Sequence, residues 1–389
     1  MTREEALENK KIVQQTAVSN WILNNHVGTI EGATGIGKSK IFLDCLEYLR
    51  REEKVPPKTL LIVPTEGMRD IDWPDEFDKW GVSQEGVKKI CYASLSRVKL
   101  ENYDFICYDE YHNLTVPNLL KLQTLLQYKQ MKVLGLTATL PKQADWPSEV
   151  ERVHLLRTLV PSVYKITTDE AVDLGLIADF EVHVLKFELD SKNLNIETGG
   201  KTKYKTTEKS QYLYLTKQLQ KAMYGKNENL KFMAMSKRTQ FIYNLPSKYR
   251  LAKQVMEKLN IEGKRTLLMA GSIEQANLLC GQDVYHSESN QDALDRFQAK
   301  SINFLGAVKA LDEGRNLVDL DQLLILQVTS GERRLIQKIG RCVRYREDHK
   351  ALIVILVTLD TADEKWYEKA IAGFETSRIT VTHVKVPEL

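Results

Sequence analysis

Hydrophobic residues fall along this chain in short runs that alternate with stretches of helical periodicity. Four early runs end in small or polar residues, which is typical of the buried strands of an α/β fold. They are "HVGTIEG" (26–32), "TLLIVPT" (59–65), "DFICYDE" (104–110) and "KVLGLTAT" (132–139). The rhythm predicts a parallel sheet covered by helices, with functional residues at the carboxyl ends of its strands.

The same rhythm restarts in the second half, with "RTLLMAG", "INFLGAV", "QLLILQV" and "ALIVILV". A chain of 389 residues is also too long for one ordinary core. We therefore expect two α/β domains, one over 1–160 and one over 181–389, joined by a connector at 161–180. A segment at about 192–235 breaks the rhythm and is predicted to be an insertion in the second domain.

Composition narrows the class of protein only a little. Hydrophobic content of 43%, charged content of 28% and a net charge of +3 fit a globular protein and neither require nor exclude nucleic acid. No apolar segment is long enough for a signal peptide or a membrane span. The cysteines are widely spaced, without a C-x-x-C pair, and are expected to be reduced thiols of a cytoplasmic protein, or of the host cytoplasm if the protein is viral. They are Cys45, Cys91, Cys107, Cys280 and Cys342.

The first motif with a candidate binding role lies at residues 31–40, "EGATGIGKSK", where the spacing from Gly32 to Ser39 fits G-x-x-x-x-G-K-[ST]. In such a loop, which here includes Thr34, Gly35 and Gly37, backbone N–H groups surround phosphates. Lys38 would reach the β and γ phosphates, and Ser39 would hold Mg²⁺. A glycine-rich turn without a ligand is the alternative, but the preceding strand favours nucleotide binding.

An acidic pair, Asp109 and Glu110, ends the strand before "YH". Beside a phosphate loop, the first acid can hold Mg²⁺ and the second can orient and deprotonate the attacking water. A solvated acidic pair is the alternative. Thr137 and Thr139 follow another strand; they could hydrogen-bond the acidic loop or simply cap the strand end.

The second half contains "ERRLIQKIGRCVRYRED" (332–348). On a helix, Gln337, Arg341 and Arg344 share one face, from which two arginines can stabilise charge developing on a γ-phosphate. A solvated basic helix face is the alternative. Shortly before, Glu313, Gly314 and Asn316 are predicted to lie in a loop ahead of a strand.

The inserted segment is strongly basic. Residues 200–231 contain eight lysines, two acids and no arginine, with four tyrosines among them. Lysines follow a phosphate backbone and tyrosines stack on bases, so Lys201, Lys203, Tyr204 and Lys205 are candidate nucleic-acid contacts. A solvated helical arm whose tyrosines pack inward is the alternative.

As an ordered set, "GATGIGKS", "LLIVPT", "DEYH", "TAT", "LLMAGS", "LDEGRN" and "QKIGRCVR" resemble the motifs of superfamily 2 helicases and translocases. The match runs roughly from residue 10 to 345. The "DEYH" motif gives the DExH type. The order in which a pattern similar to E-G-x-D-x-P precedes Q-x-x-G-R-x-x-R is most similar to the branch of type III restriction-enzyme motor subunits and phage helicases.

The resemblance implies two RecA-like domains with ATP in the cleft between them. It assigns Lys38 and Ser39 to phosphate and Mg²⁺, Asp109 to the metal and Glu110 to the base. The remaining assignments are arginine fingers (Arg341, Arg344), coupling residues (His112, Gln337), an adenine contact (Gln14) and backbone-phosphate contacts (Pro64, Thr65, Gly271, Ser272). Val13, Asn316 and Val318 depart from the usual pattern near the adenine and sugar contacts.

The leading hypothesis is therefore an ATP- and Mg²⁺-dependent helicase or translocase that acts on DNA as a monomer. An RNA helicase remains open, because no residue is specific for DNA. A motor subunit that needs a protein partner also remains open. A P-loop kinase would have no use for the "QKIGRCVR" helix and is set aside.

Overall fold

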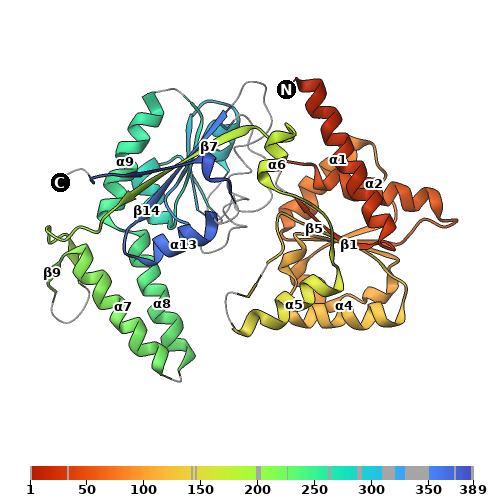
Figure 1. Ribbon diagram of the computed structural model, residues 1–389, viewed down its shortest axis with the longest axis horizontal. Helices are drawn as coiled ribbons and strands as arrows, with labels where there is room; N and C mark the ends of the chain where they lie inside the picture. Colours follow the sequence, from red (N-terminus) through yellow and green to blue (C-terminus); the bar gives the residue numbers. More distant parts are fainter. Residues whose placement is uncertain are drawn as a thin grey trace. The chain divides into compact units, whose positions relative to one another are not determined.

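The computed structural model describes residues 2–32, 35–141, 143–144, 147–198, 203–225, 227–261, 264–286, 291–308, 320–328, 350–371 and 374–386. The chain divides into two compact units, with the boundary between Asp179 and Phe180 (Figure 1). Each unit is an α/β structure with its own sheet and its own hydrophobic core.

The first unit contains a six-stranded sheet in the order β3-β2-β4-β5-β1-β6, and all of its ladders are parallel. The long crossovers that parallel strands require are made by helices. The strands are β1 Val27–Gly32, β2 Thr59–Val63, β3 Val87–Cys91, β4 Phe105–Asp109, β5 Lys132–Thr137 and β6 Ser162–Ile166.

Alternate residues of these strands enter two separate cores, as the two-residue period of a strand requires. Leu61, Phe105 and Cys107 belong to one core, whereas Leu60 and Ile106 belong to the other. The first core is covered by α1, α2 and α3, and the second by α4 and α5. These helices are α1 Arg3–Leu23, α2 Lys38–Glu52, α3 Trp73–Trp80, α4 Val116–Tyr128 and α5 Val150–Leu159.

Short helical turns complete the first unit. The segment Met68–Asp72 is a π-helix, η1, which leads directly into α3. The 3-10 turns are η2 Tyr92–Arg97, η3 Leu100–Asn102, η4 Tyr111–Asn113 and η5 Pro147–Glu149.

The segment predicted as a connector, 161–180, has regular structure of its own. Its first part is β6, which pairs with β1 and so forms an edge of the first sheet. It continues through α6, Thr168–Asp173, whose capping box is formed by Thr167 and Glu170. The segment ends as β7 begins.

The second unit contains a seven-stranded sheet in the order β11-β12-β10-β13-β14-β7-β15 (Figure 1). Five of its ladders, β11–β12, β12–β10, β10–β13, β13–β14 and β7–β15, are parallel. The prediction of an α/β fold with two parallel sheets, as in two RecA-like domains, is confirmed. The strands are β7 Asp179–Phe187, β10 Thr266–Met269, β11 Val284–Tyr285, β12 Phe304–Ala307, β13 Gln322–Ile325, β14 Lys350–Thr358 and β15 Ile379–His383.

Four helices and a 3-10 turn accompany the described strands of this sheet. They are α9 Pro246–Ile261, α10 Ile273–Cys280, α11 Asp292–Gln298, α13 Ala362–Ile371 and η6 Thr376–Arg378. None of the helices in the described parts of the chain is long and apolar enough to cross a membrane.

Between β7 and α9 the chain forms a small β-hairpin and then a pair of helices. The hairpin consists of β8 Ile196–Glu197 and β9 Lys205–Thr206, which are antiparallel. The helices are α7 Glu208–Tyr224 and α8 Glu228–Tyr243, and they pack against each other as a helical hairpin. α8 extends beyond the residues predicted for the insertion.

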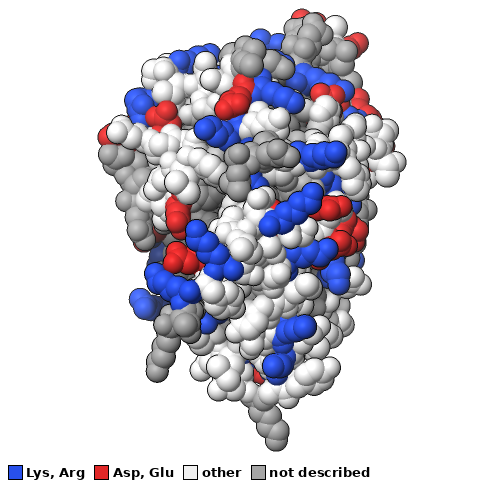
Figure 2. Space-filling model, turned by 90° about the vertical axis from the view of Figure 1, so that its left-hand side faces the viewer, with Lys and Arg blue, Asp and Glu red and all other residues white. Residues whose placement is uncertain are grey.

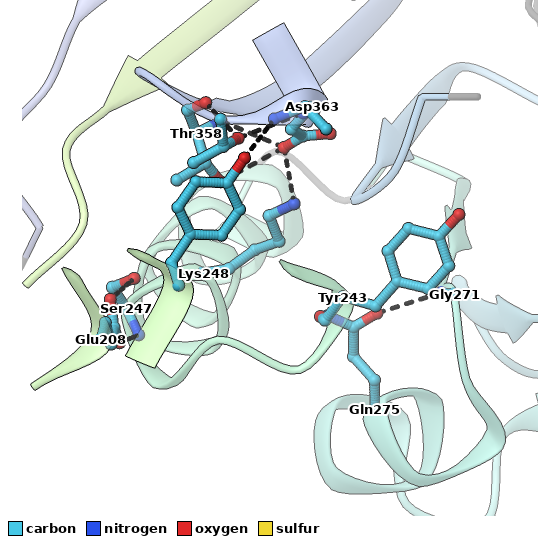
Figure 3. A network of polar contacts seen from close by, with 11 residues as sticks. Glu208, Tyr243, Ser247, Lys248, Gly271, Gln275, Thr358 and Asp363 are labelled. Carbon is cyan, nitrogen blue, oxygen red and sulfur yellow. Dashed lines mark hydrogen bonds and ion pairs between the residues drawn. The ribbon is translucent and has the colours of Figure 1, made fainter. Parts of the chain in front are cut away.

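The base of the helical hairpin is fixed by buried polar contacts (Figure 3). Glu208, at the start of α7, is fully buried and accepts hydrogen bonds from the Ser247 backbone N–H at 2.8 Å and hydroxyl at 2.7 Å. The Tyr212 hydroxyl accepts one from the Ala362 N–H at 2.9 Å. Tyr212 is therefore a packing residue, as the inward-facing alternative for the tyrosines predicted.

Candidate nucleotide site and nucleic-acid surface

The loop between β1 and α2 has the backbone conformation that its glycines permit. Gly35 and Gly37 have φ angles of 105° and 87°, in the left-handed region that other residues rarely adopt. Gly37 is also the N-cap of α2. The chain thus turns from a buried strand into a helix whose first N–H groups and positive dipole end are suited to an anion.

Lys38 and Ser39 form the first turn of α2. The Lys38 Nζ donates to the Gly32 carbonyl oxygen at 2.8 Å, so the ammonium group lies back over the loop. Ser39 is half-buried beside it. An ammonium group, a serine hydroxyl and a nearby carboxylate are the donor set that a Mg²⁺-nucleotide needs, so these residues fit ATP and Mg²⁺.

Helix α1 supports this loop from one side. The buried Gln14 amide donates to the Ile36 carbonyl at 3.0 Å, and Lys10 Nζ donates to the Gly35 carbonyl at 2.9 Å. A Cβ atom on Gly37 would lie 2.2 Å from Gln14 Nε2, and its φ angle of 87° is one that side chains rarely adopt, so a substitution here would be strained. Gln14, for which the resemblance implies an adenine contact, holds the glycine loop at Ile36 in this structure.

The acidic pair lies at the same edge of the sheet as the loop. Asp109 ends β4, which is separated from β1 only by β5, so the two strand ends are about 10 Å apart. Asp109 is 8% exposed, and its Oδ2 accepts a hydrogen bond from Trp73 Nε1 at 3.0 Å. Glu110 has a φ angle of 53°, a left-handed conformation that redirects the chain immediately after the strand.

Tyr92 fixes the backbone of this acidic turn. Its hydroxyl lies 2.8 Å from the Asp109 carbonyl oxygen and 3.1 Å from that of Glu110, positioned to donate to both. Burial raises the pKa of Tyr92 well above its ordinary value, and the charge of Asp109 adds to the shift. The hydroxyl therefore stays protonated and remains a donor at any physiological pH.

His112 and Thr137 join the acidic turn to the strand beside it. His112 Nδ1 lies 2.8 Å from Thr137 Oγ1 and 3.3 Å from Glu110 Oε2, and the imidazole is buried. The Thr139 hydroxyl instead donates to its neighbour, the Ala138 carbonyl, at 2.7 Å. Of the two threonines, Thr137 contacts the histidine next to the acids, whereas Thr139 makes a local strand-end contact.

Residues that motif spacing does not identify also shape this site. The buried Glu31 carboxylate accepts a hydrogen bond from the Leu140 N–H at 2.8 Å and so ties the end of β1 to the turn after β5. Trp73, Tyr92 and Lys10 likewise contact the site residues directly. An isolated aromatic or lysine carries no signal in the sequence, because its partner lies far away along the chain.

The proposed backbone-phosphate residues lie at strand ends in both units. Thr65 is exposed, and its Oγ1 accepts a hydrogen bond from the Met68 N–H at 3.3 Å. Pro64 before it is half-buried. Ser272 caps α10 by accepting from the Gln275 N–H at 3.1 Å, which is the ordinary role of a serine at a helix start.

Gly271 is held closely by its surroundings (Figure 3). Its N–H donates to Gln275 Oε1 at 3.0 Å, and the same side chain donates to the Tyr243 carbonyl at 2.7 Å. A Cβ atom on Gly271 would lie 1.7 Å from the Gln327 amide. Only glycine fits here without a rearrangement.

Several predicted site residues lie outside the described part of the structure. They are Thr34, Lys201, Glu313, Gly314, Asn316, Gln337, Arg341 and Arg344.

The described basic residues of the insertion differ in their surroundings. Lys203 Nζ lies 3.5 Å from Glu197 Oε1, an exposed ion pair on the β8–β9 hairpin. Tyr204 and Lys205 are exposed there as well. The hairpin thus carries an acid next to its lysine, which weakens its positive field.

The charge on the exposed face of helix α7 is more uniformly positive than that of the β8–β9 hairpin. Tyr214, Lys217, Lys221 and Tyr224 recur at spacings of three and four residues, so they share one face of the helix, and all four are exposed. We call this set the α7 stripe. In Figure 2 the lower part of this side of the molecule, where α7 and α8 lie in Figure 1, is mostly uncharged, with scattered Lys and Arg side chains and few acidic ones.

Comparisons with known proteins agree with the fold and motifs. Residues 225–346 match the family model of the helicase conserved C-terminal domain. The DNA 3'-5' translocase XPB2 of Sulfurisphaera tokodaii is 23% identical over 376 residues, which cover 90% of this chain and 82% of that protein. The chromatin remodeling factor mit1 of Schizosaccharomyces pombe is 28% identical over 138 residues, which cover 32% of this chain and 10% of mit1.

Among solved structures, the chain is similar in fold to the ATP-dependent Type ISP restriction-modification enzyme LlaBIII bound to DNA. The TM-score is 0.57 at 14% identity, over 96% of this chain and 31% of that chain. At this identity the likeness concerns the fold alone. Residues 225–346 thus resemble a helicase C-terminal domain, and the chain resembles LlaBIII in fold.

Proposed function

We propose that this chain is an ATP-dependent DNA helicase or translocase of the DExH type, similar to the restriction-enzyme and phage branch of superfamily 2. The observation that supports this most directly is the edge of the first sheet. There the glycine loop, with Lys38 and Ser39, follows β1, and the acidic turn, with Asp109 and Glu110, follows β4, which is separated from β1 only by β5.

In this proposal each residue of the first unit has a chemical role. Lys38 binds the β and γ phosphates, and Ser39 and Asp109 hold the metal ion. Bound Mg²⁺ would neutralise phosphate charge. Glu110 orients the attacking water and accepts its proton, and His112, in contact with both Glu110 and Thr137, couples this base to the neighbouring strand.

Predicted motif residues outside the described part of the structure complete the reaction in this proposal. Arg341 and Arg344 would stabilise charge on the γ-phosphate, and Gln337 would couple the two predicted domains. Glu313, Gly314 and Asn316 contact the nucleotide sugar. These assignments rest on the family resemblance of the motifs.

DNA is proposed as the substrate because XPB2 is named a DNA translocase and LlaBIII is a restriction-modification enzyme bound to DNA. Pro64, Thr65, Gly271 and Ser272 would contact the phosphate backbone. We add the α7 stripe, where two lysines would follow phosphates and two tyrosines would stack on bases. We also propose that the protein acts as a monomer in the cytoplasm.

The test is ATP hydrolysis measured with single-stranded DNA, duplex DNA and RNA of matched length, each at several salt concentrations. The proposal expects DNA to stimulate hydrolysis more than RNA does, and a displacement assay on the better DNA then separates unwinding from translocation. Stronger stimulation by RNA would favour the RNA helicase alternative. Hydrolysis that needs an added protein would favour the motor-subunit alternative. Absence of Mg²⁺-dependent hydrolysis under every condition would refute the proposal.

A further inference from the structure

Trp73 lies where two parts of the candidate nucleotide site meet. Its indole N–H donates to Asp109 Oδ2 at 3.0 Å, and the tryptophan is only 3% exposed. A hydrogen bond from a buried donor to a carboxylate is short, directional and strengthened by the low local dielectric. This contact therefore fixes the direction in which the Asp109 carboxylate points.

The indole is itself held by aromatic packing. Its ring lies 5.3 Å from that of Phe42, edge to face, and 6.3 Å from that of Phe77. Phe42 lies on α2, three residues after Ser39, and also stacks on Phe105 of β4 at 5.7 Å. One tryptophan thus contacts both the strand that carries Asp109 and the helix that begins with Lys38.

The chain that leads into Trp73 begins at a proposed nucleic-acid contact. Thr65 Oγ1 accepts a hydrogen bond from the Met68 N–H at 3.3 Å, and the Met68 carbonyl accepts one from the Trp73 N–H. The turn between them is the π-helix η1, a rare conformation that is frequent at functional sites. Three consecutive hydrogen bonds therefore connect the Thr65 hydroxyl, through Met68 and Trp73, to the Asp109 carboxylate.

We propose that Trp73 is a positioning residue that orients Asp109 for Mg²⁺ and links nucleic-acid binding at Thr65 to nucleotide binding at the phosphate loop. The inference rests on the proposed function, because it takes Asp109 as the metal carboxylate. A phosphate bound at Thr65 would favour one conformation of the turn that leads into Trp73. Through its N–H, the indole would then favour one orientation of the Asp109 carboxylate.

Trp73→Phe removes the N–H donor and keeps an aromatic ring in the core. Groups that orient a metal ligand typically affect metal affinity by about 10–100-fold. We expect the Mg²⁺ concentration needed for half-maximal binding of a fluorescent ATP analogue to rise by about tenfold or more. Binding of the same analogue without Mg²⁺ should be unchanged. Linkage also requires that single-stranded DNA strengthen analogue binding less in this variant than in the parent.

Trp80→Phe is the matched control. Trp80 ends the same helix, α3, and its indole N–H donates to Glu76 Oε2 at 3.2 Å in an exposed contact. This substitution therefore also removes an indole N–H donor, but away from Asp109. It should match the parent in Mg²⁺ dependence and in linkage to DNA.

A second variant guards against a general packing defect. Benzothienylalanine in place of Trp73 has sulfur where the indole has N–H, and keeps the shape of the side chain. It should reproduce the effect of Trp73→Phe. The positioning role is refuted if neither change at Trp73 differs from the parent and from Trp80→Phe. It is also refuted if Trp73→Phe has an effect and the benzothienylalanine variant has none. A parent protein that binds no Mg²⁺-nucleotide would instead refute the proposed function.

Discussion

At the scale of single residues, two side chains at the edge of the first sheet have roles that mutation can separate. Lys38 donates a hydrogen bond to the Gly32 carbonyl oxygen, so its side chain lies over its own loop. Glu110 has a left-handed backbone conformation and lies beside His112. In the proposed function, the positive charge of Lys38 binds the phosphates. The carboxylate of Glu110 accepts a proton from the attacking water.

Lys38→Ala removes that positive charge from the loop. We expect ATP hydrolysis to fall by about 10²–10³-fold or more, the usual effect of losing a group that stabilises developing charge. Nucleotide binding should weaken as well, since the ground-state phosphates lose the same contact. Steady-state hydrolysis and analogue binding measure the two effects. Lys40→Ala, which removes a lysine paired with Asp44 on the same helix, is the control and should behave as the parent.

Glu110→Gln keeps the size of the side chain but removes its ability to take a proton. Nucleotide binding should persist, while hydrolysis falls by about 10²-fold or more, as expected for loss of a general base. Single-turnover hydrolysis and analogue binding, measured together, distinguish the two steps. Unchanged turnover would assign the base to another residue. Glu101→Gln, at an exposed turn, controls for the loss of a negative charge.

At the scale of elements, the helical hairpin α7–α8 has a fixed base and an exposed end. Glu208 and Tyr212 are buried and anchor the base of α7 through their hydrogen bonds, whereas Tyr224 at the far end of the helix is 93% exposed. The α7 stripe runs along this exposed helix. An anchored helix whose exposed face carries two lysines between two tyrosines can hold a single strand without sequence preference.

Replacing Lys217 and Lys221 with glutamine should weaken binding of single-stranded DNA and flatten its salt dependence. Loss of two phosphate contacts changes the slope of log K against log[salt] by about 1.4 on a single strand. Hydrolysis at saturating DNA should remain, because the candidate nucleotide site is intact. Fluorescence anisotropy at several salt concentrations measures the slope.

The matched control is the pair Lys253→Gln and Lys258→Gln on α9, which removes the same charge from another exposed helix of the same unit. If both double variants change affinity and slope equally, the stripe has no specific role. The lysines of the β8–β9 hairpin would then be the next set to test.

At the scale of the whole molecule, the chain consists of two units with separate cores, and the second contains a fully buried ion pair. Lys248 Nζ of α9 lies 2.8 Å from Asp363 Oδ2 of α13, and both side chains are 0% exposed (Figure 3). The same carboxylate oxygen also accepts from the Thr358 N–H at 3.0 Å. Removing one partner leaves a charge buried without its counterion.

Lys248→Met should therefore lower the free energy of unfolding of the second unit by about 3–5 kcal/mol. Adding Asp363→Leu should recover much of this loss, because no unpaired charge is then buried. Denaturant unfolding followed by circular dichroism measures stability. If the units unfold separately, analogue binding by the first unit should persist past the first transition. A loss of binding in parallel with that transition would show that the two units unfold together.

Much of the fold follows from the sequence. All eight strands predicted from apolar runs are present, because each run is long enough and sufficiently flanked by small or polar residues to define a buried strand. The apolar runs do not predict β3, β6, β7 and β15, since their residues alternate between polar and apolar or lie partly exposed. β6 was assigned to the connector for the same reason, and only its pairing with β1 makes it part of the first sheet. The apolar runs do not predict β8, β9 and β11 either, because each is only two residues long.

For the candidate site, the sequence alone predicts a glycine loop followed by lysine and serine, an acidic pair at a strand end, and a basic insertion. These features depend on residues adjacent along the chain, so their spacing carries the signal. Three other features are visible only in the folded chain: Trp73 donates to Asp109, Gln14 supports the loop at Ile36, and Tyr212 is buried while Tyr214 is exposed. These contacts join residues from different elements, and their geometry is fixed only when the sheets and helices pack.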